Sequence, residues 1–232
     1  MKKVIAIDGP SGAGKTTIAK LIAKELGFDY LDTGALYRAV ALALREKGIE
    51  PDESEDKILE ALKGIIVTFK DGKIFLKEDS ELKTQNSELL YGRDVSEDIR
   101  SVEIDHYSSV FSAKKIVRDF LLAAQRNTAL NNDLVIEGRD TTTVVFPDAW
   151  KKIYLDASVE ERAKRRCLQF REKGIDISMD DSKRDMMERD IRDTNRDIAP
   201  LKRATDALLI DSSNLSVGQV MGKILEFIRA KP

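Results

Sequence analysis

The sequence predicts an α/β fold in which a mostly parallel sheet is covered by helices on both faces. One observation is that short apolar runs alternate along the chain with longer amphipathic segments, which is the order that βαβ units produce. A second is that polar or charged residues directly follow several of these runs, at the edge where parallel sheets place their ligands; they are Asp8 and Gly9, Asp32 and Thr33, Gly138 to Asp140, and Asp156 and Ala157.

The bulk composition fits one such domain. The 232 residues suffice for one large α/β core, or for a core with an inserted lobe. A hydrophobic content of 42% supplies that core, and 34% charged residues indicate a heavily solvated surface. The 39 basic and 41 acidic residues nearly balance, so the protein has no strong net positive charge that would attract nucleic acid or anionic membranes. We therefore expect neither of them as a partner, and we expect a monomer.

Several kinds of chemistry and location can be set aside. The single cysteine, Cys167, excludes an intramolecular disulfide and a Cys-based zinc site, and the lone His106 cannot build a His-metal cluster. Catalysis by a Ser-His or Cys-His arrangement is accordingly disfavoured. No stretch is as long and apolar as a membrane span, and residues 1–3 run directly into the first strand. We expect a cytoplasmic protein.

The first elements form a phosphate-binding turn. Residues 3–7 are a short β-branched run typical of a buried strand, residues 9–16 fit G-x-x-x-x-G-K-[ST], and apolar residues at helical spacing follow. Glycines let backbone N–H groups approach phosphate oxygens, Lys15 reaches the β- and γ-phosphates, and the Thr16 hydroxyl suits Mg²⁺. The predicted ATP-binding residues are Gly9, Pro10, Ser11, Gly12, Ala13, Gly14, Lys15, Thr16 and Thr17. A glycine-rich turn that binds nothing is the alternative, and the strand–turn–helix context disfavours it.

The other core elements follow in order. Asp32 or Thr33 can cap the helix that carries Leu36, Val40 and Leu44. Apolar runs predict further strands at residues 30–31, 134–136, 152–156 and 207–211. Periodic segments predict helices at residues 58–62, 101–111, 114–130, 159–170, 183–197 and 216–229.

A lobe is inserted between residues 65 and 100. Strands at 65–69 and 73–77 flank the hairpin signal Asp71-Gly72, residues 78–87 form a polar extension, and residues 88–99 return to the small sheet. Farther on, residues 174–181 interrupt the pattern before a highly charged helix. We therefore predict a single domain. Its core comprises about residues 1–64, 101–170 and 198–232, its inserted lobe about 65–100, and its lid about 171–197.

The charged helix carries a cluster of arginines. Arg189, Asp193 and Arg196 are spaced by four and three residues and share one face. Arginine forks suit phosphate oxygens, and such a helix could close over a triphosphate. A solvated face with ion pairs such as Arg189–Asp193 is the more ordinary interpretation, and spacing alone favours it. For Arg139 the opposite holds, because it ends a buried strand at the ligand edge.

Short stretches along the whole chain match one family in sequence and in order. They cover residues 7–15, 31–38, 94–100, 117–118 with 125–126, 137–140 with 143–149, 156–158, 189–190 and 199–201. On these residues the chain resembles the bacterial cytidylate kinases. The phosphate-binding turn alone would be generic, whereas the ordered set is specific.

This resemblance implies a P-loop kinase with a three-layer core. Its five-stranded parallel sheet has strand order 2-3-1-4-5, and an inserted monophosphate-binding lobe and a helical lid accompany it. The implied reaction is transfer of the ATP γ-phosphate to CMP or dCMP, with Mg²⁺ bound to ATP through Thr16. Lys15 and the lid arginines would stabilise the transferring phosphoryl group.

The resemblance also implies roles for individual residues. The CMP-binding positions are Thr33, Arg38, Ser109, Arg118, Arg139, Asp140, Arg189, Asp193 and Arg196. The catalytic residues are Lys15, Arg139, Arg189 and Arg192. The chemistry agrees, because carboxylate and hydroxyl oxygens can accept from the cytosine amine while arginines bind the phosphate. Which of Arg189 and Arg196 contacts sugar, base or phosphate is left open.

The chain departs from the family pattern at three places. Thr16 and Thr17 both follow Lys15, so either hydroxyl could face Mg²⁺. Residues 140–143 read Asp-Thr-Thr-Thr where the family has Asp-Met-Gly-Thr, and the segment 78–91 is longer, with Arg93 at a position that is usually acidic. These departures bear on substrate preference. Two alternatives remain: a P-loop kinase for UMP, AMP or a sugar-like acid, and a nucleotide-dependent switch with little turnover.

Overall fold

The structure is a computed structural model that describes residues 2–70, 72–78, 91–172 and 174–230. The chain forms two compact units, Met1–Tyr30 with Ala129–Pro232, and Leu31–Thr128, and each is described by itself. Asp71 of the predicted hairpin turn and residues 79–90 of the predicted extension lie outside the described residues.

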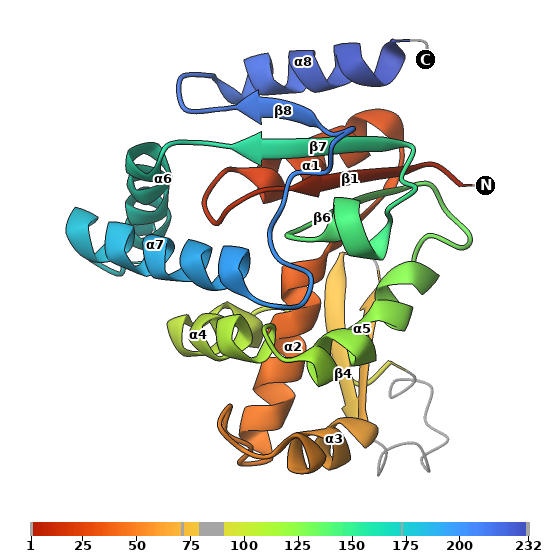
Figure 1. The fold of residues 1–232 in the computed structure, drawn as a ribbon, viewed down its shortest axis with the longest axis vertical. Helices are drawn as coiled ribbons and strands as arrows, with labels where there is room; N and C mark the ends of the chain where they lie inside the picture. Colours follow the sequence, from red (N-terminus) through yellow and green to blue (C-terminus); the bar gives the residue numbers. More distant parts are fainter. Residues whose placement is uncertain (1, 71, 79–90, 173, 231–232) are drawn as a thin grey trace. The chain divides into compact units, whose positions relative to one another are not determined.

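A parallel five-stranded sheet is the centre of the first unit (Figure 1). Its strand order is β2-β6-β1-β7-β8, which is 2-3-1-4-5 when its own strands are counted along the chain, as the resemblance implied. In β1 all five residues are buried, because strands lie on both sides and helices flank the sheet. The strands are β1 (Val4–Asp8), β2 (Asp29–Asp32), β6 (Leu134–Gly138), β7 (Lys151–Asp156) and β8 (Leu208–Asp211).

Two amphipathic helices, α1 (Lys15–Leu26) and α8 (Val217–Arg229), pack on this sheet. Ile18 and Ile22 of α1 and Ile224 of α8 join the sheet side chains in one apolar core. Ser216 starts α8 with a reciprocal capping box, which satisfies backbone donors at the helix start. Val217, the first residue of the helix, is exposed.

The helices α6 (Val159–Glu172) and α7 (Met179–Asn195) pack against each other. The charged helix starts earlier than the predicted residue 183, because Ser178 caps it by accepting a hydrogen bond from the Asp181 amide. Asp180 and Asp181 in the first turn add favourable charge at this end. The described break between the two helices is therefore only residues 174–178.

The second unit is built on the antiparallel sheet β3 (Ile65–Lys70), β4 (Lys73–Glu78) and β5 (Arg93–Asp94). The register Lys70↔Lys73 confirms the predicted hairpin. The unit also contains residues 31–64 and 101–128, which the sequence pattern placed in the core. They belong to it because α2 buries ten residues and packs on β3, β4 and α4. Its helices are α2 (Thr33–Glu46), α3 (Glu55–Lys63), η3 (Asp98–Arg100), α4 (Val102–Phe111) and α5 (Lys115–Asn127).

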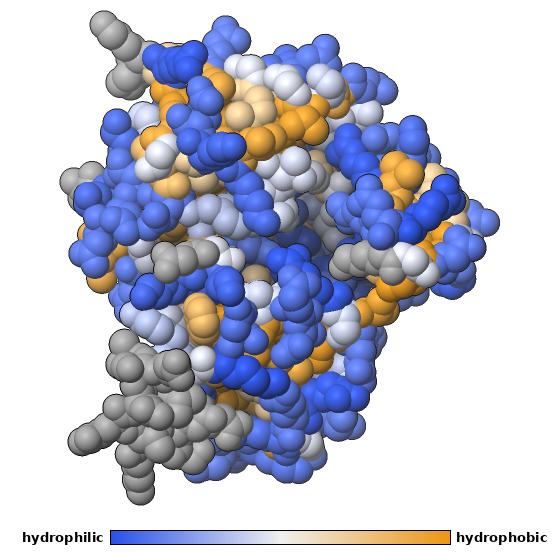
Figure 2. All heavy atoms as spheres, turned by 180° about the vertical axis from the view of Figure 1, so that it is seen from behind, coloured by the Kyte–Doolittle hydropathy of each residue, from blue (hydrophilic) through white to orange (hydrophobic). Residues whose placement is uncertain are grey.

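One face of the molecule is mostly hydrophilic (Figure 2). This agrees with the 34% of charged residues. Of the helices that the structure describes, none combines the length and the apolarity that crossing a membrane requires.

Candidate functional site

The predicted phosphate-binding turn lies between β1 and α1, as expected. Gly9 has φ 151° and Gly14 has φ 93°, conformations that residues with a side chain rarely adopt. A Cβ atom on Gly9 would lie 1.9 Å from the carbonyl oxygen of Leu155, so only glycine fits there. Lys15 is the first residue of α1, and the turn therefore presents a helix N-terminus to an anion.

Two arginines of α6 fix the backbone of this turn. Arg162 donates to the carbonyl oxygen of Ser11 at 2.9 Å, and Arg165 donates to that of Ala13 at 3.3 Å. Arg162 is buried and also pairs with Asp190 of α7 at 2.7 Å. Neither arginine was predicted as a site residue, although both follow the strand end at residues 156–158. Their positive charges add to the attraction of the turn for phosphate.

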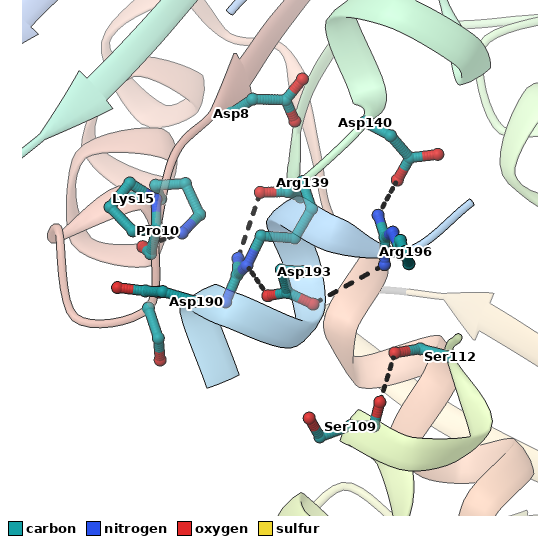
Figure 3. Close-up of polar contacts among 12 residues, drawn as sticks. Asp8, Pro10, Lys15, Ser109, Ser112, Arg139, Asp140, Asp190, Asp193 and Arg196 are labelled. Atoms are coloured by element: carbon teal, nitrogen blue, oxygen red, sulfur yellow. Dashed lines mark hydrogen bonds and ion pairs between the residues drawn. The ribbon is translucent and has the colours of Figure 1, made fainter. Parts of the chain in front are cut away.

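Lys15 is buried, and its Nζ donates to the carbonyl oxygen of Pro10 at 2.7 Å (Figure 3). Burial lowers the pKa of Lys15 to about 7, and the positive charge of Arg139 acts in the same direction. The carboxylates of Glu137 and Asp8 oppose the shift only in part. A polyphosphate near Nζ would restore the charged form.

This pKa predicts that nucleotide binding takes up a proton. At pH 8 a Lys15 with a pKa of about 7 is mostly neutral, and a bound triphosphate raises that pKa, so close to one proton should be taken up per MgATP. Affinity should accordingly fall as the pH rises above 7. Calorimetry in buffers of different ionisation enthalpy measures this uptake. The Lys15→Met variant should show none, and equal heats for the wild type in all buffers would contradict the prediction.

The Thr16 hydroxyl donates to Glu137 Oε1 at 2.5 Å, and the Tyr30 hydroxyl donates to the same oxygen at 2.9 Å. A hydroxyl and a carboxylate are oxygen ligands of the type that Mg²⁺ prefers, so these residues fit the ion. The structure holds no group of three or more His, Cys, Asp or Glu side chains able to bind a metal among its described residues. Glu137 was missed as a site residue, although it lies near the end of a buried strand.

Four of the predicted acceptor-site residues are connected by ion pairs (Figure 3). Arg139 Nε donates to Asp193 Oδ2 at 3.0 Å, while Arg196 lies 3.7 Å from both Asp193 Oδ1 and Asp140 Oδ1. Asp193 and Arg196 are almost fully buried. The interpretation of this face as solvated is therefore wrong for them, because Arg139, the residue directly after β6, covers it.

Electrostatics in this cluster favour the charged forms. Burial by itself raises the pKa of Asp193, yet the charges of Arg139, Arg189 and Arg196 outweigh it and hold the pKa below its ordinary value. Arg196 also donates from Nε to the carbonyl oxygen of Ala199 at 2.7 Å. Ala199 has φ 49°, an unfavourable conformation for a residue with a side chain. The chain after α7 is thus held in a strained turn beside the cluster.

The turn after Asp140 has an unusual backbone. Residues Thr141–Val145 form the short π-helical segment η4, which the sequence patterns did not predict. The carbonyl oxygen of Asp140 accepts from the amides of Thr143, Val144 and Val145 at 2.9–3.3 Å. Such segments occur often at functional sites.

In the second unit, Thr33 and Arg38 lie on α2. Thr33 is buried at the helix start, and Asp32 is the cap, since its Oδ1 accepts from the Ala35 amide at 3.1 Å. Asp32 Oδ2 accepts from Arg38 at 2.9 Å, and Arg38 lies 4.0 Å from Asp105. These contacts fix the direction of the Arg38 guanidinium.

Ser109 of α4 and Arg118 of α5 are buried, and Ser112 links them. Arg118 donates to the carbonyl oxygen of Ser112 at 2.9 Å. The Ser112 hydroxyl donates to the carbonyl oxygen of Ser109 at 3.1 Å (Figure 3). The Arg118 guanidinium also lies 5.3 Å from the centre of the Tyr37 ring. A buried cation and a hydroxyl residue are therefore held close together.

Comparison with known proteins decides the family. The family model described as cytidylate kinase matches residues 5–230. The chain belongs to the cytidylate kinase family. The cytidylate kinase of Thermodesulfovibrio yellowstonii is 50% identical over 97% of each chain, and that of Thermosipho melanesiensis is 45% identical over 98% of this chain and 97% of its own. A kinase is a phosphotransferase, so the protein is an enzyme of that class.

Solved structures agree on the fold. An uncharacterised protein from Eubacterium ventriosum superimposes with a TM-score of 0.53 over 99% of this chain and all of that chain, at 12% sequence identity. This similarity concerns the fold alone. Two further predicted catalytic residues, Arg189 and Arg192, lie on α7, the helix that carries Asp193. Both are half-buried.

Proposed function

We propose that the protein transfers the γ-phosphate of ATP to CMP or dCMP and thereby produces ADP and CDP or dCDP. One observation carries the proposal. The unit that holds the phosphate-binding turn and the buried Lys15 also holds a cluster of arginines and carboxylates at residues 139, 140, 193 and 196, whose side chains are at most 19% exposed. The phosphate-binding turn and Lys15 suit a triphosphate, and the cluster of arginines and carboxylates suits a second ligand that carries a phosphate. Membership of the cytidylate kinase family supports CMP as that ligand.

On the donor side, residues 9–17 bind the ATP phosphates through backbone N–H groups and the start of α1. Lys15 neutralises charge that develops on the transferring phosphoryl group. Thr16, which Glu137 orients, is the threonine that contacts Mg²⁺. When bound, Mg²⁺ neutralises phosphate charge and keeps the β- and γ-phosphates in a reactive arrangement.

On the acceptor side, Arg38 and Arg139 bind the CMP phosphate, and Asp193 binds sugar hydroxyls. Asp140, Ser109 and Arg118 recognise cytosine, whose amine is a donor and whose N3 and O2 are acceptors. Thr33 also belongs to the CMP-binding residues. These roles rest on the resemblance of the positions to those of the family. Arg139 with Arg189 and Arg192 of α7 stabilise the transferring group, and Arg189 and Arg196 also contact CMP. Water is excluded when the nucleotides are bound.

A coupled assay of ADP release tests the proposal. ATP, Mg²⁺ and each of CMP, dCMP, UMP and AMP are supplied separately, and the expected result is rapid turnover with CMP and dCMP only. Preference for UMP or AMP would make the protein a kinase of another acceptor. ATP binding without acceptor-dependent turnover would indicate a nucleotide-dependent switch and contradict the proposal.

Base selectivity should depend on Asp140. Its buried carboxylate can accept from the cytosine amine, whereas uracil presents an acceptor at the same edge. A mismatched polar partner in a desolvated site costs about 1–3 kcal/mol, so the wild type should prefer CMP over UMP by about 5- to 150-fold in kcat/KM. Asp140→Asn should narrow that ratio, and Asp140→Ala should weaken CMP use without improving UMP use. Equal losses for both substrates in both variants would assign Asp140 to the phosphate instead.

A further inference from the structure

The carboxylate of Asp8 is fully buried and accepts four hydrogen bonds. Asp8 Oδ1 accepts from the amide and the hydroxyl of Thr141 at 2.9 and 2.7 Å. Asp8 Oδ2 accepts from the amide and the hydroxyl of Thr142 at 2.7 and 2.6 Å. One carboxylate thus binds two consecutive residues through both their backbone and their side chains.

These bonds join the two halves of the site within the first unit. Asp8 is the last residue of β1, immediately before Gly9 of the phosphate-binding turn. Thr141 and Thr142 come immediately after Arg139 and Asp140 and begin the π-helical segment. The backbone that carries these two side chains is therefore tied directly to the start of the turn that binds ATP.

Stability alone does not explain this arrangement. Burial raises the pKa of Asp8 and outweighs the four hydrogen bonds, and nearby Asp140 acts in the same direction, so placing this carboxyl group in the interior has a desolvation cost. The strands are already joined by the β1–β6 pairing, which includes Asp8↔Gly138. Replacing a buried charge network by apolar residues is often neutral or stabilising. The two hydroxyls also stand at positions where the related pattern has Met-Gly.

We propose that Asp8, Thr141 and Thr142 are positioning residues that hold Arg139 and Asp140 at a fixed place relative to the phosphate-binding turn. The threonine hydroxyls prevent the π-helical segment from shifting when the acceptor binds. This inference rests on the proposed function, because it concerns the affinity for the acceptor nucleotide. The donor side should be little affected, since Arg162 and Arg165 hold the phosphate-binding turn independently.

The double variant Thr141→Val/Thr142→Val tests the proposal, because it removes both hydroxyls and keeps the side-chain shape and the amide donors. The variant loses two hydrogen bonds to Asp8, so we expect the KM for CMP to rise by about tenfold or more, while the KM for ATP changes less than about twofold. The matched control Thr141→Ser/Thr142→Ser keeps the hydroxyls and should retain the wild-type KM. An unchanged KM for CMP in a folded valine variant would overturn the proposal, as would equal rises for ATP and CMP.

Hydrogen exchange provides a readout that does not depend on turnover. In the peptide covering residues 139–145, the valine variant should exchange about tenfold faster than the wild type, and the serine variant should match the wild type. If the wild type fails to phosphorylate CMP, the proposed function is wrong, and this exchange experiment still decides whether the three residues hold the turn. Equal exchange in all three proteins would overturn the positioning role.

Discussion

The Lys15→Met variant should lose about 100-fold or more in kcat at saturating ATP and CMP. The Lys15 ammonium lies at the start of α1, inside the phosphate-binding turn, where charge develops in the transition state of phosphoryl transfer. Methionine has a similar length and no charge, so it removes the electrostatic stabilisation and little else. Steady-state kinetics with both substrates saturating measures the effect.

The fold of this variant should survive. Folding lowers the pKa of Lys15 from 10.5 to about 7, so between these values the unfolded chain holds a proton that the folded chain releases. The wild type therefore carries a penalty below pH 10.5 that the variant does not have. The Lys15→Met protein should unfold at the same or a higher temperature at pH 7. Lys24→Met, on the exposed face of α1, is the control and should keep full activity. A folded Lys15→Met enzyme with near wild-type kcat would remove Lys15 from the mechanism.

Asp193→Ala should have the second large effect, on stability and activity together. It removes the partner of Arg139 at 3.0 Å and of Arg196 at 3.7 Å, and Arg196 is almost fully buried. Removing one partner of a buried ion pair leaves an uncompensated charge, so the free energy of unfolding should fall by about 3 kcal/mol. Because Arg139 then loses its orientation, kcat/KM for CMP should fall by about 100-fold. Denaturant unfolding and steady-state kinetics measure the two effects.

This stability effect should depend on pH. The folded-state pKa of Asp193 lies below the ordinary 3.8, so its contribution is complete above pH 3.8 and is lost as the pH falls through the folded-state pKa. The difference between wild type and variant should accordingly shrink in acid. Asp185→Ala, on the exposed side of α7, is the matched control and should change little. Equal unfolding free energies for the two variants at pH 7 would show that the cluster contributes nothing to stability.

The sequence was sufficient to predict the α/β class and the phosphate-binding turn because both depend on local patterns, whereas the strand order came from the family resemblance. The apolar run before Gly9 and the spacing of Gly9, Gly14 and Lys15 determine a strand, a turn and a helix within about twenty residues. The hairpin between β3 and β4 is likewise predicted from neighbouring residues, because Asp71-Gly72 stands between two strand-like runs. The extent of the second unit was not predictable in this way, since it depends on how α2 packs against β3, β4 and α4.

The site contacts that were missed join residues far apart in the chain. Asp8 binds Thr141 across 133 positions, Thr16 binds Glu137 across 121, and Arg162 binds the backbone of Ser11 across 151. Periodicity and spacing describe one element at a time and carry no information on such pairs. The burial of Asp193 escaped prediction for the same reason, because its partner Arg139 lies 54 positions away, directly after β6.

Phosphorus NMR of the reaction mixture tests the central proposal most directly. The protein is mixed with ATP, Mg²⁺ and CMP, and all phosphorus species are followed in time. We expect CDP and ADP to appear in equal amounts while ATP and CMP disappear and inorganic phosphate stays at the level of an enzyme-free control. Formation of ADP and inorganic phosphate with CMP unchanged would show that water accepts the phosphoryl group, which would contradict a CMP kinase.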